Sequence, residues 1–285
     1  MRRTLALIAS SFLTLACTTT VAQAAAPTPK ITKVIVFMVE NHSLSEMQSG
    51  MPKTYKFASK YAVATHYQAI THPSLPNYLA IAAGSTLGVT DDANPSGHLL
   101  TGPTIFSQAL THHKTAKTYA DAMPSNCYPT NAGEYAVRHN PWTYFTDDAA
   151  ACQKYDVPAT RLAHDTKAGK LPNLGFIVPD VIDDAHDGTL AQADAWISAQ
   201  IRLLTSGSDW KSGHLAIVVT ADEDDHSGDN TVLTTVASRY QKHKVVTTPL
   251  THYSLTGFID AVLHVKPLRG AATAPSMAKA FKVNL

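Results

Sequence analysis

Residues 215–225, LAIVVTADEDD, decide the fold, because an uninterrupted apolar run ends there in a cluster of carboxylates. The stretch VIVFMVEN at residues 34–41 has the same pattern and ends in Glu40 and Asn41. Apolar runs of this kind are typical of strands that are buried on both faces of a parallel sheet. Two such strand ends can meet at the carboxyl edge of one sheet, where open α/β folds bind their ligands.

The rest of the chain alternates between strand-like and helix-like segments. The expected strands are Ile31–Val39, Thr115–Tyr119, Leu174–Val178, Leu215–Thr220 and Thr231–Val236. The expected helices are Thr54–Tyr61, Asn77–Ala83, Thr104–Leu110, Leu190–Leu204 and Ser254–Val262. Apolar strands separated by helical segments predict an α/β fold, with a mostly parallel sheet and helices on both faces.

Residues 1–26 have the composition of a secretory signal peptide. Arg2 and Arg3 precede an apolar stretch, and the segment ends in an Ala-x-Ala pattern at residues 22–24. The apolar stretch is too short for a lasting transmembrane span. Cys17 leaves open a lipoprotein, in which this cysteine would carry the lipid, although Thr14 stands where such signals usually have an aliphatic residue.

The mature chain, residues 27–285, has the length of a single domain, and 45% of the full sequence is apolar. Removing Arg2 and Arg3 from the 23 basic residues leaves 21 against 22 acidic residues, with no basic run. This balance argues against nucleic acid as a partner. No later apolar stretch is long enough to span a bilayer. We therefore expect a secreted or periplasmic protein without stable membrane insertion.

Cys127 and Cys152 are the two cysteines that remain in the mature chain. In an oxidising compartment we expect them to form a disulfide that closes a loop of roughly 25 residues and stabilises the fold by about 3 kcal/mol. Two buried free thiols are the alternative.

Oxygen-bearing side chains at the two strand ends are candidate metal ligands. Glu40 and Asn41 offer carboxylate and amide oxygens, which suit a hard cation, although Asn41 or Ser43 could instead cap a helix. Asp222 and Glu223 begin a run of four carboxylates that would repel one another without a cation. A solvated acidic loop is the alternative.

Ser74 is the candidate nucleophile, because the Pro76 that follows is typical of a first helical turn. Free backbone N–H groups at a helix start favour an alkoxide and the anion that it attacks. A plain N-cap serine is the competing interpretation. Thr71 is a second hydroxyl, and His72 lies between the two.

Two further polar clusters could bind phosphate or move a proton. Arg138 and His139 are neighbours, and Asp184 and His186 follow the expected third strand. A cationic Arg or His suits a phosphoryl oxygen, and a His beside a carboxylate suits proton delivery to a leaving group. His252 opens the last expected helix, as a site residue or as a neighbour of its N-cap. Each histidine alone could be structural, since the chain has 14.

Taken together, these residues describe phosphoryl transfer better than ester or peptide cleavage. Oxygen ligands, a hydroxyl at a helix start and Arg and His donors are what that reaction needs. The chain lacks the Gly-x-Ser-x-Gly turn of serine hydrolases and the His-Glu-x-x-His helix of zinc peptidases.

Six stretches of the chain resemble motifs of one protein family. They are VEN at 39–41, THPSLPNYLAIAAGSTLGVT at 71–90, RHNPW at 138–142, FIVPDVIDDAHDGTLAQADAWI at 176–197, TADEDD at 220–225 and HYSL at 252–255. On these residues the chain resembles the bacterial phosphoesterase family, which holds secreted acid phosphatases and phosphatidylcholine-type phospholipases C. The likeness covers nearly the whole mature chain and is strongest to the acid phosphatase branch.

The resemblance implies an alkaline-phosphatase-like α/β fold and one divalent metal ion. Its implied metal ligands are Glu40, Asn41, Asp222 and Glu223. It implies that Ser74 forms a phosphoserine, and that Asp184, His186 and His139 hold phosphate or protonate the departing alcohol. We further expect Asn77, Arg138 and His252 to bind substrate.

The function expected from these observations is that of a secreted, metal-dependent acid phosphatase. Its partner would be a small phosphate ester or a phosphoinositide. Oxygen ligands favour calcium, magnesium, manganese or iron over zinc. Two alternatives remain: a phospholipase C acting on lipid headgroups, and a non-catalytic secreted protein that keeps the metal for structure.

Overall fold

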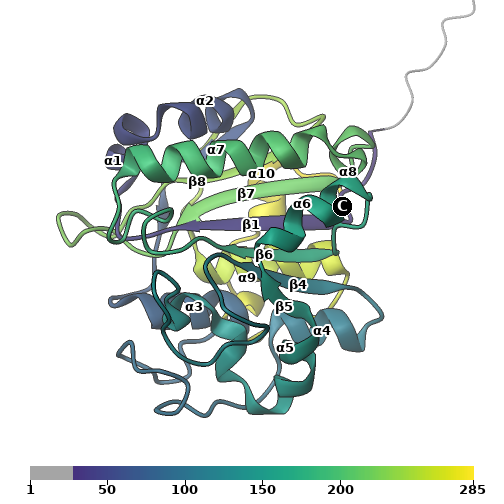
Figure 1. Ribbon diagram of the computed structural model, residues 1–285. Helices are drawn as coiled ribbons and strands as arrows, with labels where there is room; N and C mark the ends of the chain where they lie inside the picture. The colour runs from purple at the N-terminus through teal and green to yellow at the C-terminus, as the bar shows by residue number, and fades with distance from the viewer. Residues whose placement is uncertain (1–27) are drawn as a thin grey trace, which may run out of the picture.

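The computed structural model describes residues 28–285, and at its centre lies an eight-stranded sheet with the strand order β5-β4-β6-β1-β7-β8-β2-β9 (Figure 1). The strands of this sheet are β1 (Lys33–Val39), β2 (Ala62–Ala64), β4 (Ala116–Ala120), β5 (Asp156–Pro158), β6 (Leu174–Val178), β7 (Leu215–Ala221), β8 (Thr234–Ser238) and β9 (Lys244–Val246). A separate pair consists of β3 (Tyr67–Gln68) and β10 (Leu250–Thr251).

The sheet is mostly parallel, as the sequence predicts. β1 pairs in parallel with β6 on one side and with β7 on the other, and β4 continues the parallel order to β5. Only β8 runs against its neighbours β7 and β2. The carboxyl ends of β6, β1 and β7 therefore lie side by side at one edge of the sheet.

Helices cover both faces of the sheet (Figure 1). On one face, α7 (Leu190–Ser206) packs against α1 (Leu44–Gly50), α2 (Pro52–Lys60), α6 (Thr160–Lys167) and α8 (Ser208–Lys211). On the other face, α9 (His252–Leu263) packs against α3 (Ser74–Ala83), α4 (Ile105–Thr111) and α10 (Met277–Phe281). The α/β fold class with helices on both faces is thereby confirmed.

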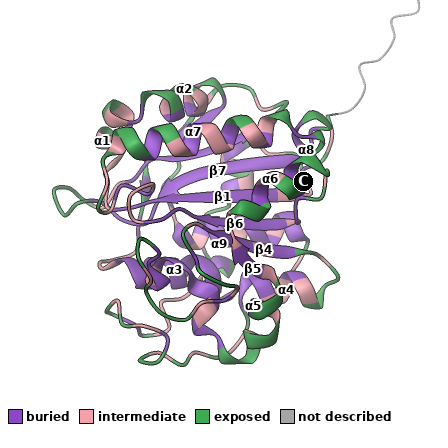
Figure 2. Ribbon diagram, viewed as in Figure 1, coloured by how far each residue is buried: buried purple, intermediate pink, exposed green. Residues whose placement is uncertain are grey.

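The central strands are buried because both of their faces are apolar. Every residue of β7 is buried, and so is every residue of β1 after Lys33. Figure 2 shows these strands as a buried layer, with exposed residues on the helices α1, α2 and α7 that cover one face. The strand ends are thus held firmly, which is what a site built on them requires.

The observed elements match most of the expected ones, with a few corrections. α3 begins at Ser74, three residues before the expected start at Asn77. β8 covers Thr234–Ser238 rather than Thr231–Val236. The short strands β2, β5 and β9 were not expected, because three residues carry too little pattern to predict a strand. Ser43 is the N-cap of α1, so this serine, and not Asn41, starts that helix.

The segment between β4 and β6 carries one further helix, three short 3-10 helices and the disulfide. Its elements are Val137–His139, Pro141–Tyr144, Thr146–Asp148 and α5 (Ala149–Tyr155); a fourth 3-10 helix, Arg269–Ala272, follows α9. Cys127 and Cys152 are bonded, with their Cα atoms 5.4 Å apart, which confirms the expected pairing.

The expected signal peptide, residues 1–26, and Cys17 lie outside the described residues. Among residues 28–285, none of the helices has both the length and the apolar character that a bilayer crossing requires.

Candidate active site

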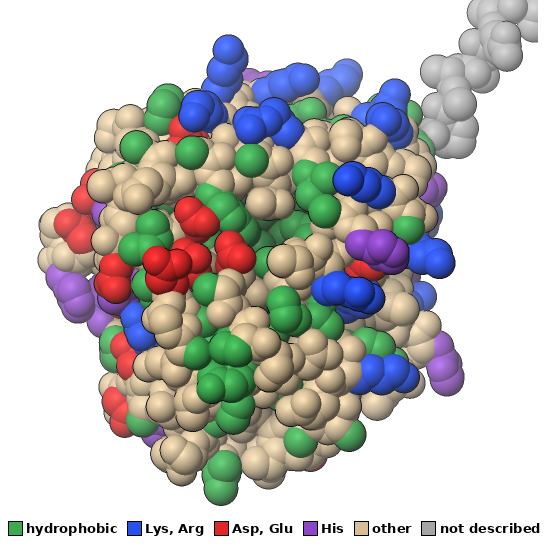
Figure 3. Space-filling model, viewed as in Figure 1, with side chains coloured by type: hydrophobic (Ala, Val, Ile, Leu, Met, Phe, Trp, Pro, Cys, Tyr) green, Lys and Arg blue, Asp and Glu red, His purple; other side chains and the backbone are tan. Residues whose placement is uncertain are grey.

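Three strand ends bring the predicted carboxylates together. Glu40 follows β1, Asp222 follows β7, and Asp184 lies in the turn after β6. The backbone N–H of Glu40 donates to the Asp184 carbonyl at 2.8 Å, and that of Asp222 donates to the carbonyl of Val39 at 3.0 Å. The three segments are therefore tied to one another by main-chain hydrogen bonds beyond the sheet. Figure 3 shows acidic side chains gathered on the side toward which β1 and β7 run.

Glu40 is the centre of the site. It is completely buried, and its Oε2 accepts a hydrogen bond from Ser74 Oγ at 3.0 Å. The hydroxyl of Tyr78 donates to Oε1 of the same carboxylate. The Nε2 atom of His139 lies 3.1 Å from Oε2. A candidate metal ligand, the candidate nucleophile and a candidate proton carrier thus meet at one carboxylate.

His139 lies between two carboxylates. Its Nδ1 atom is 3.0 Å from Asp184 Oδ2, on the far side of the ring from Glu40. Burial lowers the pKa of His139, but the negative charge of Glu40 and the contacts with both carboxylates outweigh burial and raise the pKa to about 9. For Glu40, burial alone would raise the pKa. The positive charge of His139 outweighs burial, and the pKa of Glu40 is lowered to about 2. One imidazolium therefore faces two carboxylates, and burial raises the pKa of the second, Asp184, to about 6.

Asp222 has fewer partners. Its Oδ1 accepts a hydrogen bond from the backbone N–H of Asn41 at 3.1 Å. Asn41 has a φ of 55°, a left-handed conformation that asparagine adopts more readily than most residues. The Oδ2 atom of Asp222 is buried, and residues 28–285 supply no hydrogen-bond partner for it. Burial, followed by the charges of Glu40 and Glu223, raises the pKa of Asp222 well above its usual range.

Glu223 is held by two residues that precede or begin α3. Its Oε2 accepts from Asn77 Nδ2 at 2.9 Å and lies 3.2 Å from His72 Nδ1. Burial, followed by the charge of Glu40, raises the pKa of Glu223 to about 8. Asp222 and Glu223 therefore form a half of the site in which negative charge exceeds the partners that the protein supplies.

The side chain of Asn77 organises the turn before α3. Its Oδ1 accepts the N–H groups of Ile70 and Thr71 at 2.9 and 3.2 Å, and its Nδ2 also donates to the Thr71 carbonyl at 2.7 Å. Both the oxygen and the nitrogen of the Asn77 side-chain amide therefore hydrogen-bond the main chain of this turn. The expected substrate-binding role of Asn77 stays a prediction.

Ser74 is the first residue of α3, as its position two residues before Pro76 suggested, and it is 2% exposed. The next backbone N–H, that of Leu75, donates to Asp92 Oδ1 at 2.9 Å. The hydroxyl of Thr71 is directed elsewhere, because it donates to the carbonyl of His72 at 3.1 Å. Within the described residues, the Ser74 hydroxyl donates to a predicted metal ligand, Glu40, and the Thr71 hydroxyl does not.

Arg138 and His186 lie beside this centre. The guanidinium Nη2 of Arg138 donates to His186 Nε2 at 2.9 Å, and His186 Nδ1 lies 2.6 Å from Asp187 Oδ1. The backbone N–H of His186 donates to Asp184 Oδ1 at 2.7 Å. Arg138 also approaches Asp92, with 4.0 Å between Nε and Oδ2. The two predicted clusters, from distant parts of the chain, therefore meet.

His252 is fully buried behind the strand end rather than in the open part of the site. Its Nε2 donates to the backbone carbonyl of Asp222 at 2.6 Å, so Nδ1 accepts from the hydroxyl of Tyr67 at 3.0 Å. Burial lowers the pKa of His252 to about 4, although the Asp222 carbonyl opposes this shift. Both ring nitrogens are thus occupied by the protein, and this arrangement orients the Asp222 backbone. The substrate-binding role of His252 stays a prediction.

The sequence did not single out Tyr78, Asp92 or Tyr67. Tyr78 had a signal, because it is four residues after Ser74 and so lies on the same face of the helix. Asp92 had none, since it lies in a polar loop whose path only the tertiary structure fixes.

The residues at this edge of the sheet fit a divalent cation. Glu40, Asp222 and Glu223 converge, and the buried Oδ2 of Asp222 has no partner within the described chain. Carboxylate oxygens are the donors that hard divalent ions prefer. Glu40 also belongs, with His139 and Asp184, to a group whose ligand atoms lie within 4.8 Å of one another.

A model of the phosphoesterase family matches residues 47–266, well over half of the chain. The chain belongs to the phosphoesterase family. Family members are hydrolases that act on phosphate esters, so the predicted reaction class is confirmed.

Among relatives of this phosphoesterase, the phosphatidylinositol-3-phosphatase of Mycobacterium tuberculosis is 30% identical over 88% of this chain and 83% of that protein. The phosphate-repressible acid phosphatase of Penicillium chrysogenum is 29% identical over 72% of this chain and 53% of that protein. A Vibrio parahaemolyticus structure in the alkaline phosphatase superfamily aligns with a TM-score of 0.56 at 9% identity, covering 84% of this chain and 68% of that one. At that identity the structural match concerns the fold alone, and it confirms the alkaline-phosphatase-like architecture.

Proposed function

We propose that this phosphoesterase is a secreted, metal-dependent acid phosphatase that hydrolyses phosphomonoesters through a phosphoserine at Ser74. The observation that carries the proposal is the contact between Ser74 Oγ and Glu40, 3.0 Å long, at the first residue of α3. A buried seryl oxygen beside converging carboxylates is suited to attack phosphorus and poorly explained as a plain helix cap.

Glu40, Asp222 and Glu223, with the Asn41 amide oxygen, would hold the divalent cation. When bound, such an ion lowers the pKa of a nearby hydroxyl and neutralises charge on phosphoryl oxygens. Calcium, magnesium, manganese and iron all accept oxygen ligands of this kind. Tyr78 and His139 fix the orientation of Glu40, so the carboxylate does not need the ion in order to stay in position.

The reaction has two steps at Ser74. In the first, Ser74 Oγ forms a bond to phosphorus, the bond from phosphorus to the substrate alcohol breaks, and the alcohol leaves with a proton. In the second, water attacks the phosphoserine, phosphate departs, and the seryl oxygen regains a proton. The N-terminus of α3 favours the negative charge that develops beside it in both steps.

Two cationic side chains, Arg138 and His139, would stabilise the phosphoryl group. Arg138 would donate to the phosphoryl oxygens, and the charged His139 adds positive potential between Glu40 and Asp184. When Arg138 turns to the phosphate, it frees His186 Nε2. We assign protonation of the departing alcohol to His186, because its side chain is 28% exposed while that of His139 is 1% exposed.

Secretion rests on residues 1–26 and on the disulfide. The bond between Cys127 and Cys152 is typical of proteins that fold in an oxidising compartment. A phosphoinositide is a candidate substrate, because the mycobacterial relative is named a phosphatidylinositol-3-phosphatase. Comparing hydrolysis of p-nitrophenyl phosphate with that of p-nitrophenylphosphorylcholine separates the phosphomonoesterase from the phospholipase C alternative.

Replacing the nucleophile tests the proposal directly. Ser74→Ala should lower phosphate release by roughly 10⁴-fold or more, while folding and metal content persist, because the alanine removes the attacking atom. Acid quenching with a ³²P-labelled ester should trap label on the wild-type protein and none on the variant. Thr71→Val is the matched control and should remain active. If Thr71→Val loses the trapped label and Ser74→Ala keeps it, the nucleophile is Thr71.

A further inference from the structure

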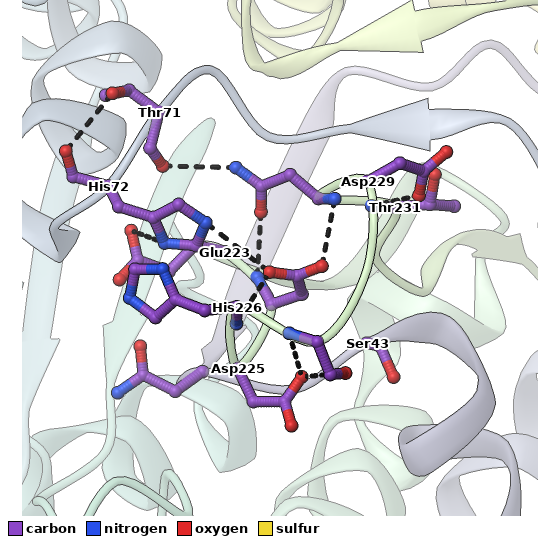
Figure 4. Close-up of polar contacts among 12 residues, drawn as sticks. Ser43, Thr71, His72, Glu223, Asp225, His226, Asp229 and Thr231 are labelled. Atoms are coloured by element: carbon purple, nitrogen blue, oxygen red, sulfur yellow. Dashed lines mark hydrogen bonds and ion pairs between the residues drawn. The ribbon is translucent and has the colours of Figure 1, made fainter.

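Two histidines and two carboxylates form a second polar cluster on the Glu223 side of the centre. One ligand atom each from His72, Glu223 and His226 lies within 4.8 Å of the others. The imidazole rings of His72 and His226 stack, with centroids 3.8 Å apart and an interplanar angle of 26°. Figure 4 shows both rings directed toward the Glu223 carboxylate, one from the turn before α3 and the other from the loop after β7.

His72 faces a carboxylate at each of its nitrogens. Nε2 lies 3.4 Å from Asp224 Oδ1, and Nδ1 lies 3.2 Å from Glu223 Oε2. A neutral imidazole carries only one N–H, so if Nε2 donates to Asp224, Nδ1 presents a lone pair to the Glu223 oxygen. Nδ1 is buried and has no hydrogen-bond partner among the described residues. Two electron-rich atoms in contact need a positive charge between them or beside them.

Hydrogen bonds to Asp224 hold the loop that carries His226. Asp224 Oδ1 accepts the backbone N–H of His226, and Oδ2 accepts that of Asn230, both at 2.9 Å. Asn230 Oδ1 accepts the backbone N–H of Asp224 at 2.8 Å, and Asn230 Nδ2 donates to the carbonyl of Thr71 at 3.2 Å. The loop is thereby closed on itself and attached to the segment that carries His72. The two imidazoles are brought together by a defined set of hydrogen bonds.

We propose that His72, Glu223 and His226 form a second divalent-cation site, with Asp224 as the carboxylate that orients His72. The 3.2 Å between His72 Nδ1 and Glu223 Oε2 is close to the spacing of about 3.3 Å between two ligand atoms on one tetrahedral zinc ion. Imidazole ligands favour zinc and similar ions, whereas the all-oxygen set at Glu40 favours harder ones. A histidine whose other ring nitrogen donates to a carboxylate is the usual arrangement at zinc sites.

The second site would share Glu223 with the proposed catalytic centre but takes its specificity from two histidines that the centre does not use. His72 is two residues before Ser74 in the sequence, so an ion here adds positive charge on the side where Asp222 and Glu223 leave an excess of negative charge. The site therefore supplies a cation on the phosphate-binding side without any change in the fold.

Zinc stoichiometry tests the proposal with a readout that does not depend on activity. Metal-free protein would be titrated calorimetrically with Zn²⁺ alone, in the wild type and in His72→Asn and His226→Asn. We expect each variant to bind one equivalent fewer than the wild type. His164→Asn is the matched control, because this histidine is 67% exposed and also lies beside a carboxylate, Asp165, yet belongs to no such cluster. It should bind as many equivalents as the wild type.

Failure of the proposed catalytic centre would be seen separately, as the absence of trapped label on wild-type Ser74. That failure would leave the loss of one zinc equivalent in His226→Asn unchanged. If both histidine variants bind as many equivalents as the wild type, the second site does not exist. Hydrogen exchange gives a second readout: zinc should protect residues 224–230 in the wild type, and absence of this protection overturns the proposal. Far-UV and near-UV spectra confirm that each variant is folded.

Discussion

The two halves of the candidate active site balance their charge in different ways. Around Glu40, two carboxylates share one buried imidazolium, since His139 contacts Glu40 at 3.1 Å and Asp184 at 3.0 Å. Around Asp222 and Glu223, the nearest donors are the neutral amides of Asn41 and Asn77, and the ring of His72 lies beside Glu223. Accordingly, the pKa of Glu40 is lowered. Burial raises the pKa of Asp184 to about 6, and the pKa values of Asp222 and Glu223 are raised further.

This difference in charge balance indicates which half of the site would depend on an external cation. Breaking a buried ion pair leaves an uncompensated charge, so the Glu40 half is stable only as a complete set. Within residues 28–285, Asp222 and Glu223 form no ion pair with a Lys or Arg, so the proposal has this half gain its cation by binding a metal ion. One half is thus neutralised in part by the fold itself, and the other is proposed to bind an external cation.

The largest expected effect is on the Asp222 half. Asp222→Asn should lower kcat/KM by roughly 10⁴-fold, or about 5 kcal/mol, because the carboxylate proposed to bind the metal is lost. In chelator, however, the variant should melt at a higher temperature than the wild type, since a buried charge repelled by Glu40 and Glu223 is gone. The amide oxygen still accepts the N–H of Asn41. Kinetics, elemental analysis and melting curves check this, and a lower melting temperature in chelator would contradict the comparison.

The next effect concerns the ion-paired half. His139→Gln should destabilise the protein by about 3–5 kcal/mol, with or without metal, because Glu40 and Asp184 lose the charge that they share. Denaturant unfolding with and without chelator measures this. His186→Gln is the control on the exposed rim and should cost less than about 1 kcal/mol. A loss in His139→Gln that disappears when metal is added would show that the two halves do not differ as described.

A smaller effect is expected from Tyr78→Phe. The variant removes the hydroxyl that donates to Glu40 Oε1, a hydrogen bond to a charged acceptor, and should cost about 1.5–3 kcal/mol. Tyr144→Phe is the matched control, because Tyr144 donates to a neutral carbonyl, that of Ala93, at 3.1 Å; it should cost about 0.5–1.5 kcal/mol. Equal losses of unfolding free energy in the two variants would mean that Glu40 does not carry the charge assigned to it.

The sequence predicts the parts of this site that lie on long, regular elements. Glu40 and Asp222 could be placed because apolar strands point to their own carboxyl ends, and Ser74 because Pro76 marks a helix start. The meeting of Arg138 with His186 depends on the irregular segment between β4 and β6. No periodic pattern describes such a path.

The same limit applies to the acidic loop after β7. The sequence offered two interpretations of residues 222–225, a metal site and a solvated loop. In the structure, Asp224 orients its own loop through Asn230, while Asp225 is exposed and bonds to Ser227. Which of four adjacent carboxylates turns inward depends on backbone conformations such as the positive φ of His226, and one sequence does not reveal them.

Under the proposed secretion, the disulfide would link catalytic competence to cellular compartment. Cys127 and Cys152 enclose the stretch that carries both Arg138 and His139, so the cations that would face a phosphoryl group sit on a covalently fastened loop. In a reducing cytosol that fastening would be absent, and the newly made protein would hold its phosphate-recognising residues less firmly. Export would then complete the enzyme as well as deliver it, and phosphate esters inside the producing cell would be spared until the chain had crossed the membrane.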